Sequence, residues 1–290
     1  NSITFRYIPL FLAVVTAKAK VNGICDLHSN DIMEQCFFRE ILISIPHNPN
    51  QMAVHRSTNN LYFSFDFGDR EYMPAILSID TKDLLVLTGV KDAFAVAANL
   101  TGEDIFFGGG YGIYKYIPHQ KRLKRLAREN LDVWELFIHK NIIYFIQFPS
   151  LNVFRYCHRE VHPVHELENV TVHQLVFDGE GNMYFINATG LYTLKQGKGP
   201  VQAIKKNTKF LSLAVDQTGN VYVSDEKGVY SVTVNVVNTV EKIINLQGVM
   251  GMTFDKENNL IYTNSQELTR LLPLNTEKYR SHYTSITILR

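Results

Sequence analysis

A short motif recurs along the chain and constrains its fold more than any other feature. An apolar strand runs into a polar turn that starts with Asp and ends with Asn, and a second strand containing a tyrosine follows, as in residues 213–225. The same pattern is found at 176–187 and at 253–264. Asp and Asn side chains hydrogen-bond to the turn backbone and Gly supplies a positive φ, so the motif specifies a β-hairpin. The chain is therefore expected to consist of repeated antiparallel hairpins.

Six copies of this unit align on the aromatic residue of the second strand, at Tyr62, Phe106, Tyr144, Tyr184, Tyr222 and Tyr262. Neighbouring copies are about forty residues apart, which is the length of a four-stranded propeller blade. Aromatic residues make up 12% of the chain, which favours strands, and no stretch keeps a helical period. We predict an all-β, six-bladed β-propeller with about four strands per blade. The alternative, a β-sandwich, does not explain so regular a repeat.

The two ends of the chain predict how the ring closes. The segment Arg39–Ile45 resembles the fourth strand of a blade, but the first three strands of such a blade are not found before it. We expect it to complete the sixth blade, whose other strands come from the C-terminal end, because this pairing covers an exposed edge. Residues 283–289 compete for the same position. The propeller is expected to span residues 38–290.

The N-terminus has the pattern of a secretory signal. Residues 1–19 contain Arg6, then a short apolar run, then small residues around Ala17 and Ala19. The apolar run is too short to span a membrane, so we predict a secreted protein without a membrane partner. Residues 20–37 would form an N-terminal arm of the mature protein. Three sequons predict glycosylation at Asn99, Asn169 and Asn187.

Three cysteines, Cys25, Cys36 and Cys157, are expected to meet an oxidising environment. The simplest pairing joins Cys25 to Cys36 and fastens the arm. A bridge between Cys36 and Cys157 would instead tie the arm to the propeller. One cysteine is left over in either case.

The charge of the chain argues against a polyanionic partner. Lys and Arg number 29 and Asp and Glu number 28, which gives a net charge of +1. Such a balance produces no global field for nucleic acid, and we expect none to bind. The basic stretch 121–125 and the histidines of 158–165 are interpreted as solvated outer hairpins. A zinc site among His158, His162, His165 and His173 is the weaker alternative. We expect a monomer.

The first residues of the innermost strands predict a binding site at one mouth of the channel, opposite the repeated turns. The first of these positions is bulky and partly aromatic, and the next is polar or small. Neighbouring loops add further side chains, among them Phe148. An aromatic-walled mouth with a few polar groups suits a flat small molecule. We predict that three residues stack on the ligand, Phe94, Tyr111 and Trp134, and that five bond to its polar edge, Glu135, His173, Gln174, Asp225 and Asn264. The alternative is that these side chains only plug the channel.

Several of these features together resemble the ommochrome-binding proteins of moth and butterfly blood. They are the signal, the arm segment Val21–Cys25, the strand Arg39–Ile43, and repeats that continue into short Gly-Leu-Tyr or Gly-Val-Tyr strands. The resemblance covers residues 1–290. It implies a secreted haemolymph carrier for ommochromes, the tryptophan-derived phenoxazinone pigments, or for their precursors. It further implies no catalysis and no cofactor besides the bound pigment, and it transfers no residue-level binding motif.

Two other classes stay open. The repeats also resemble the six-bladed lactone hydrolases and strictosidine-synthase-like enzymes. The hydrolases hold a divalent metal such as calcium or zinc in the channel with Glu, Asn and Asp, and this chain offers Glu135, Asn187, Asp225 and Asn264 in comparable regions. The alternative function is therefore a metal-dependent lactone hydrolase. A propeller used only as a protein-binding platform predicts a polar, plugged channel, against which the aromatic residues argue.

Overall fold

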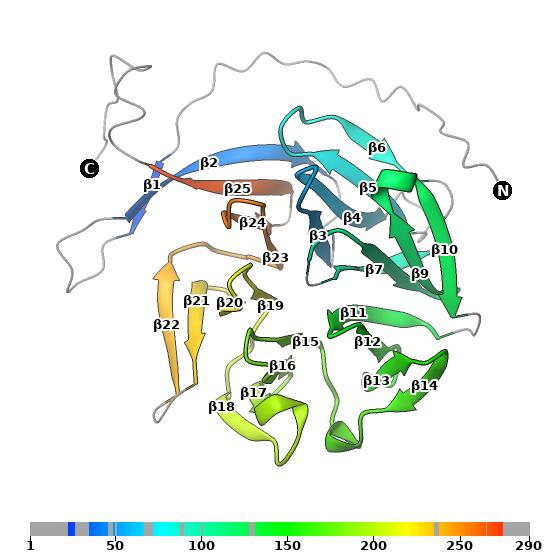
Figure 1. Ribbon diagram of the computed structural model, residues 1–290. Coiled ribbons are helices and arrows are strands. Elements are labelled where there is room, and N and C mark those ends of the chain that lie inside the picture. The colour runs from blue at the N-terminus through cyan, green and yellow to red at the C-terminus, as the bar shows by residue number, and fades with distance from the viewer. Residues whose placement is uncertain are drawn as a thin grey trace, which may run out of the picture.

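The chain folds into six antiparallel sheets arranged around a central axis, as the computed structural model shows in Figure 1. The structure describes residues 23–26, 35–45, 49, 51–66, 72–87, 90, 92–99, 101–127, 131–234, 238–264 and 266–274. The predicted signal at 1–19 and the competing strand at 283–289 lie outside these residues. The prediction of an all-β, six-bladed propeller with about four strands per blade is confirmed, since five sheets have four strands and one has five.

The first three blades follow one another along the chain. Blade one contains β3 (Met52–His55), β4 (Asn60–Asp66), β5 (Tyr72–Ser78) and β6 (Leu84–Val86). Blade two contains β7 (Ala93–Ala98), β8 (Ile105–Gly109), β9 (Gly112–Ile117) and β10 (Arg122–Ala127). Blade three contains β11 (Val133–His139), β12 (Ile142–Gln147), β13 (Asn152–Cys157) and β14 (Glu160–Pro163).

The second half of the ring repeats the plan. Blade four contains β15 (Gln174–Phe177), β16 (Met183–Asn187), β17 (Gly190–Leu194) and β18 (Gln202–Lys206). Blade five contains β19 (Ser212–Val215), β20 (Val221–Asp225), β21 (Gly228–Thr233) and β22 (Thr239–Ile244). Blade six contains β23 (Gly251–Phe254), β24 (Leu260–Thr263), β25 (Glu267–Pro273), β2 (Gln35–Ser44) and β1 (Gly23–Asp26). Three single-turn 3-10 helices are present among the described residues. Two lie in outer hairpins, η1 (Pro118–Gln120) and η3 (Lys195–Gly197), and η2 (His165–Leu167) lies in the connection between blades three and four.

Large apolar side chains fill the spaces between blades. The residue that follows the aromatic of the second strand points to the opposite face of its sheet and is fully buried at Phe63, Phe107, Phe145 and Phe185. Each blade therefore buries both of its faces against neighbours, which explains why apolar residues are not confined to alternate positions. These contacts fix the blades around the axis, so the innermost strands β3, β7, β11, β15, β19 and β23 surround the channel (Figure 1).

The repeated turn is a structural element. In blade five, Oδ1 of Asp216 accepts backbone N–H groups from Thr218 and Asn220, each at 2.9 Å. Its Oδ2 accepts from the Asn220 amide at 3.1 Å and from the Tyr222 hydroxyl at 3.2 Å. Asp178 makes the corresponding bonds in blade four, including one from Tyr184. A single carboxylate thus folds the hairpin and ties it to the second strand.

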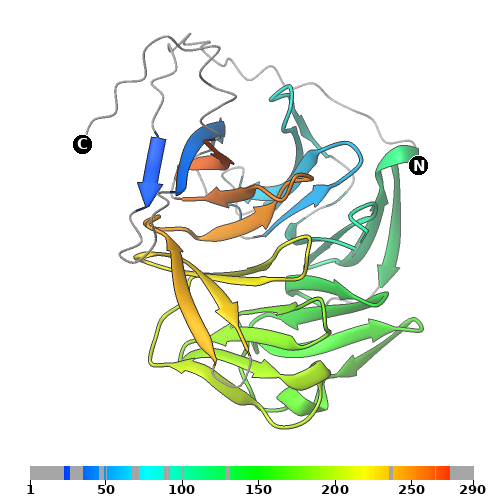
Figure 2. The ribbon, with the colours of Figure 1, turned by 60° about the vertical axis from the view of Figure 1, so that its left-hand side comes forward.

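The ring closes through the N-terminal strand, as predicted. Strand β2 pairs antiparallel with β25 from Phe37 to Ser44, and both views show blue β2 beside red β25 (Figures 1 and 2). Glu40 on β2 and Arg270 on β25 form an ion pair with a closest distance of 2.6 Å. Arg270 also contacts Asp255 in the β23–β24 turn at 3.3 Å, and Glu40 contacts Lys82 of blade one at 2.5 Å. We call Glu40, Asp255 and Arg270 the closure triad.

The cysteine prediction gains support from the strand register. Strand β1 pairs with β2 so that Cys25 stands directly opposite Cys36. Facing positions in an antiparallel pair are close enough for a disulfide, and the bridge between them stays a prediction. Cys157 at the end of β13 is free, which removes the alternative pairing.

The three sequons differ in accessibility. Asn169 is exposed. The carboxamide of Asn99 instead caps the β7–β8 turn, where its Oδ1 accepts from the Glu103 and Asp104 backbone. Asn187 accepts from the backbone of Thr189 and donates to the Thr171 carbonyl. Asn169 is therefore the sequon best placed to carry a glycan. Among the described residues, no helix is long and apolar enough to cross a membrane.

Candidate functional site

Four aromatic side chains form a continuous row across blades one to three. The ring of Phe94 lies 4.6 Å from that of Tyr72 in an edge-to-face contact, measured between centroids. It lies 4.5 Å from the ring of Trp134 with 32° between the planes. Trp134 in turn stacks on Phe148 at 5.7 Å and 25°. We call Tyr72, Phe94, Trp134 and Phe148 the aromatic row. Phe148 is 47% exposed, so solvent reaches the row from that end.

The row lies at the mouth of the channel away from the repeated turns. Phe94 and Trp134 occupy the starts of innermost strands, and Phe148 directly follows a second strand. The register of β7 with β8 shifts between Ala93 and Ala95, and that of β11 with β12 shifts between Val133 and Glu135. Phe94 and Trp134 are therefore the extra residues of β-bulges, which turn side chains out of the regular pleat. This explains how two sheets present aromatic rings to each other here.

Acidic residues lie beside the aromatic row. Burial raises the pKa of the Tyr72 hydroxyl, and the negative charges of Asp66 and Asp92 raise it further. Burial also raises the pKa of Asp132, to which the charge of Asp92 adds. Phe148 donates its backbone N–H to the carbonyl of Asp132 at 2.8 Å, which places this acid next to the row. The local potential therefore favours a ligand with a positively charged edge.

Polar side chains cross the channel behind the row. Oε1 of Gln51 accepts the backbone N–H of Val96 at 3.2 Å and of Leu136 at 3.0 Å. Oε1 of Gln174 accepts the N–H of Leu213 at 2.7 Å. These bonds connect innermost strands of different blades. Gln51 and Gln174 therefore fit the alternative, in which side chains plug the channel, better than they fit ligand binding.

A cavity of about 330 Å³ extends from this polar layer toward the repeated turns. Its walls come from the second halves of the innermost strands and from the turns that follow, and Phe254 of blade six is among them. The aromatic row does not line it. The channel therefore offers two separate surfaces, the aromatic row at one mouth and this cavity at the other.

Glu135 is the buried acid of the channel. Its side chain is 3% exposed and its Oε1 accepts the N–H of Leu175 at 3.3 Å. No described residue bonds to its Oε2. Burial raises the pKa of Glu135 well above the ordinary value, and the bond from Leu175 offsets this only in part. The carboxyl group is therefore held toward its neutral form, which can donate a hydrogen bond from Oε2.

Substitution of Glu135 by Gln is expected to raise the free energy of unfolding at pH 8 on the order of 1 kcal/mol. A group whose pKa is raised by folding loses stabilising effect as pH rises through the folded value, whereas an amide does not ionise. The gain should therefore be smaller at pH 5 than at pH 8. Urea denaturation at both values measures this, and an equal effect at the two pH values would contradict it.

Two other predicted residues have structural roles. Oδ1 of Asp225 accepts the backbone N–H groups of Lys227 and Gly228, at 2.7 and 3.0 Å, and its Oδ2 accepts the Tyr230 hydroxyl. Oδ1 of Asn264 likewise accepts two backbone N–H groups, both at 3.1 Å. These side chains cap the hairpins between second and third strands. Their oxygens are engaged there, so the structure does not bring them to the aromatic row.

The remaining predicted residues surround the mouth less directly. His173 is half-buried and burial lowers the pKa of its imidazole. Tyr111, at the β8–β9 turn, is 50% exposed, and no ring contact joins it to the row among the described residues. Phe148 was expected in a loop at this mouth but was not included among the binding residues. Tyr72 was missed by the sequence prediction, and only its nearness to a strand end hinted at a place at the mouth.

Comparison with known proteins finds similarity both by sequence and by fold. No family model matches the chain. An ommochrome-binding protein of Manduca sexta is 24% identical over 271 residues, which covers 88% of this chain and 98% of that protein. A gluconolactonase of Xanthomonas campestris superposes with a TM-score of 0.66 at 13% identity, over 88% of this chain and 96% of that one. A calcium-binding regucalcin of Agrobacterium tumefaciens superposes with a TM-score of 0.63 at 11% identity, over 81% and 93%. The two solved structures share the propeller fold with this chain.

Proposed function

We propose that the protein is a secreted carrier that binds an ommochrome-type pigment, or a related tryptophan-derived aromatic metabolite, on the aromatic row. The row carries the proposal, because its four rings follow one another at centroid distances of 4.5–5.7 Å and end on exposed Phe148. The similarity to the Manduca sexta ommochrome-binding protein over nearly its whole length supports the same role.

The chemistry of the row fits a fused, planar ring system. A phenoxazinone laid on Trp134 and Phe148 would bury apolar area and gain roughly 0.5–1.5 kcal/mol for each aromatic contact beyond that burial. Asp92 and Asp132 would face the amino group that tryptophan-derived metabolites can retain. His173 could bond to a polar edge, since its imidazole is held toward the neutral form. The proposed ligand is therefore flat, aromatic and amine-bearing.

Secretion is part of the proposal. The signal pattern at 1–19 supports it, together with the facing positions of Cys25 and Cys36 and the exposed sequon at Asn169. A disulfide and a glycan both belong to an oxidising, extracellular environment. The haemolymph would be the place where such a carrier meets its pigment.

The lactone hydrolase alternative depends on a metal that this chain's expected ligands do not fit. Asn187, Asp225 and Asn264 each use their side-chain oxygen to cap a hairpin, and Oε1 of Glu135 accepts the backbone N–H of Leu175. A shared ion would require breaking these caps. The hydrolase would gain support if the purified protein carried stoichiometric calcium and hydrolysed gluconolactone.

A pigment titration tests the proposal directly. Trp134 is the only tryptophan of the chain, so its fluorescence reports from the row itself. Xanthommatin is expected to quench this emission to saturation at one pigment per protein, with a matching change in the pigment's visible absorption. Gluconolactone is the matched non-aromatic control and should leave the emission unchanged. Unchanged emission and absorption at saturating xanthommatin would contradict the proposal.

A further inference from the structure

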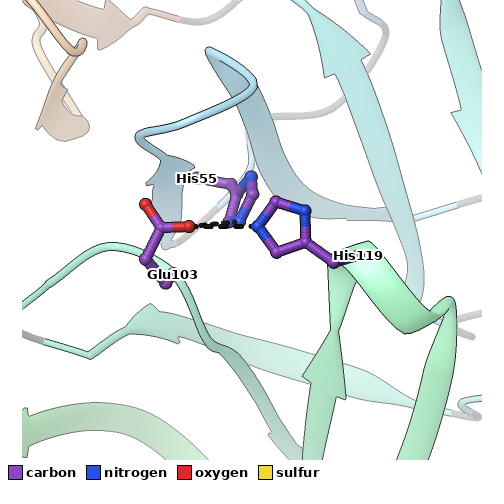
Figure 3. A group of neighbouring side chains, drawn as sticks. All are labelled: His55, Glu103 and His119. Atoms are coloured by element: carbon purple, nitrogen blue, oxygen red, sulfur yellow. Dashed lines mark hydrogen bonds and ion pairs between the residues drawn. The ribbon is translucent and has the colours of Figure 1, made fainter.

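Three side chains from two neighbouring blades lie close together at the turn ends of the innermost strands. His55 ends the innermost strand of blade one, Glu103 lies in the β7–β8 turn of blade two, and His119 lies in η1. Figure 3 shows both imidazoles directed at one carboxylate oxygen of Glu103. Among the described residues this is the one group of three or more His, Cys, Asp or Glu side chains whose ligand atoms converge.

The distances within this group match a tetrahedral metal site. Nε2 of His55 is 3.3 Å and Nε2 of His119 is 3.2 Å from the same Oε2 of Glu103. All three ligand atoms lie within 4.8 Å of one another. Two ligands bound to zinc at ~2.0–2.1 Å in tetrahedral geometry are ~3.3–3.4 Å apart. The two nitrogen–oxygen distances are therefore close to edges of that tetrahedron, and closure of the imidazoles toward each other would complete the third.

Neighbouring residues hold the ligands in place. His55 is fully buried and its Nδ1 lies 2.6 Å from Oγ1 of Thr58. When Nδ1 donates to this oxygen, Nε2 presents its lone pair to the centre of the group, which is the usual second-shell arrangement of a metal-bound histidine. Ser57 donates to the Glu103 carboxylate at 2.9 Å and fixes its rotamer. One ligand is thus rigid and a second is oriented.

The site is open to solvent on its other side. The side chains of His119 and Glu103 are 60% and 41% exposed, so an ion can enter without unfolding of the blade. Two imidazoles, one carboxylate and a water molecule form the ligand set of an open zinc site. Nitrogen and oxygen ligands in this combination favour zinc and neighbouring transition metals over calcium or magnesium.

We propose that His55, Glu103 and His119 bind one zinc ion, which joins the turns of blades one and two. The site is separate from the aromatic row, because it lies at the turn ends of the innermost strands. It differs from the zinc site considered for the histidines of 158–173. Its three ligands come from separate elements, so no short sequence motif identifies the site.

Calorimetric titration of the metal-free protein with zinc chloride tests the proposal. The wild type is expected to bind one zinc ion and to gain Tm, and cobalt in place of zinc should give the intense visible bands of tetrahedral coordination. His119→Ala and Glu103→Gln change exposed side chains and should each weaken binding by roughly 100-fold or more. The test does not need His55→Ala, so unfolding caused by a substitution at a buried position does not complicate the result.

The matched control is His162→Ala. His162 lies 3.5 Å from Glu160 on the outer hairpin of blade three, which gives an exposed His–carboxylate pair without a second imidazole. This variant should bind zinc as the wild type does. Absence of one-to-one binding in the wild type would overturn the proposal. So would equal zinc affinity in the wild type, His119→Ala and Glu103→Gln, which would mean adventitious surface binding only.

Discussion

Substitution of Arg270 by Met is expected to lower the free energy of unfolding by about 3–5 kcal/mol, the cost of removing one partner from a buried ion pair. Arg270 joins the N-terminal strand to the last blade through Glu40 and also contacts Asp255. Asp255 is fully buried, so its carboxylate would lose its charged partner without gaining water. The methionine keeps most of the aliphatic packing, so the loss reports on the charge.

The control for Arg270→Met is Arg155→Met. Arg155 is exposed on β13, and its loss should change stability by no more than about 0.5 kcal/mol. Urea denaturation of the two variants and the wild type gives the comparison. An Arg270→Met protein within 0.5 kcal/mol of the wild type would show that strand pairing alone closes the ring.

The effect of Arg270→Met should also depend on pH. Burial raises the pKa of Glu40, but hydrogen bonds and charges from Lys82 and Arg270 outweigh it and leave a net lowered value. A carboxylate with a lowered folded pKa stabilises the protein above its unfolded pKa of about 4.3 and loses this effect as pH falls through the folded value. The difference between Arg270→Met and the wild type should therefore be larger at pH 7 than at pH 3.

Substitution of Trp134 by Ala is expected to weaken pigment binding by roughly 100-fold, which is the size of a central aromatic hot spot. Trp134 is one of the two inner rings of the row and contacts both Phe94 and Phe148. Its removal takes away the largest stacking surface and separates its two neighbours. Equilibrium dialysis with xanthommatin measures the change, since the variant has no tryptophan emission.

A second variant separates binding from folding. Trp134 is half-buried and packs against the core of blades three and four, so its loss also costs stability. Phe148 is 47% exposed, and Phe148→Ala should leave the Tm near that of the wild type. We expect this variant to bind xanthommatin roughly 10-fold more weakly. Unchanged affinity in Phe148→Ala would limit the site to the inner end of the row.

The fold could be predicted from the sequence because its signals are local and repeated. Asp178, Asp216 and Asp255 each fold their own turn, so one motif identifies a hairpin wherever it occurs. The closing strand could be predicted because Arg39–Ile45 has the pattern of a blade strand without a blade of its own. Both inferences use interactions within a few residues or a simple count of strands.

The candidate site was predicted only in part because it depends on the directions in which side chains point. The sequence placed Phe94 and Trp134 at the starts of innermost strands, where the structure has them, but the bulges that turn their rings together leave no mark in the strand pattern. An Asp or Asn at a hairpin end can cap the turn or reach a ligand, and the sequence of Asp225 and Asn264 does not distinguish these roles. His55 and His119 come together only through packing of an outer hairpin beside the neighbouring blade.

The most direct test of pigment binding on the aromatic row compares the two mouths of the channel in one experiment. Phe254 is an aromatic residue that lines the cavity at the opposite mouth, which makes Phe254→Ala the matched variant to Trp134→Ala. Dissociation constants for xanthommatin are measured by equilibrium dialysis for the wild type and both variants. We expect Trp134→Ala to lose roughly 100-fold in affinity and Phe254→Ala to bind as the wild type does. Loss of affinity in Phe254→Ala with none in Trp134→Ala would contradict the account and place the pigment in the cavity.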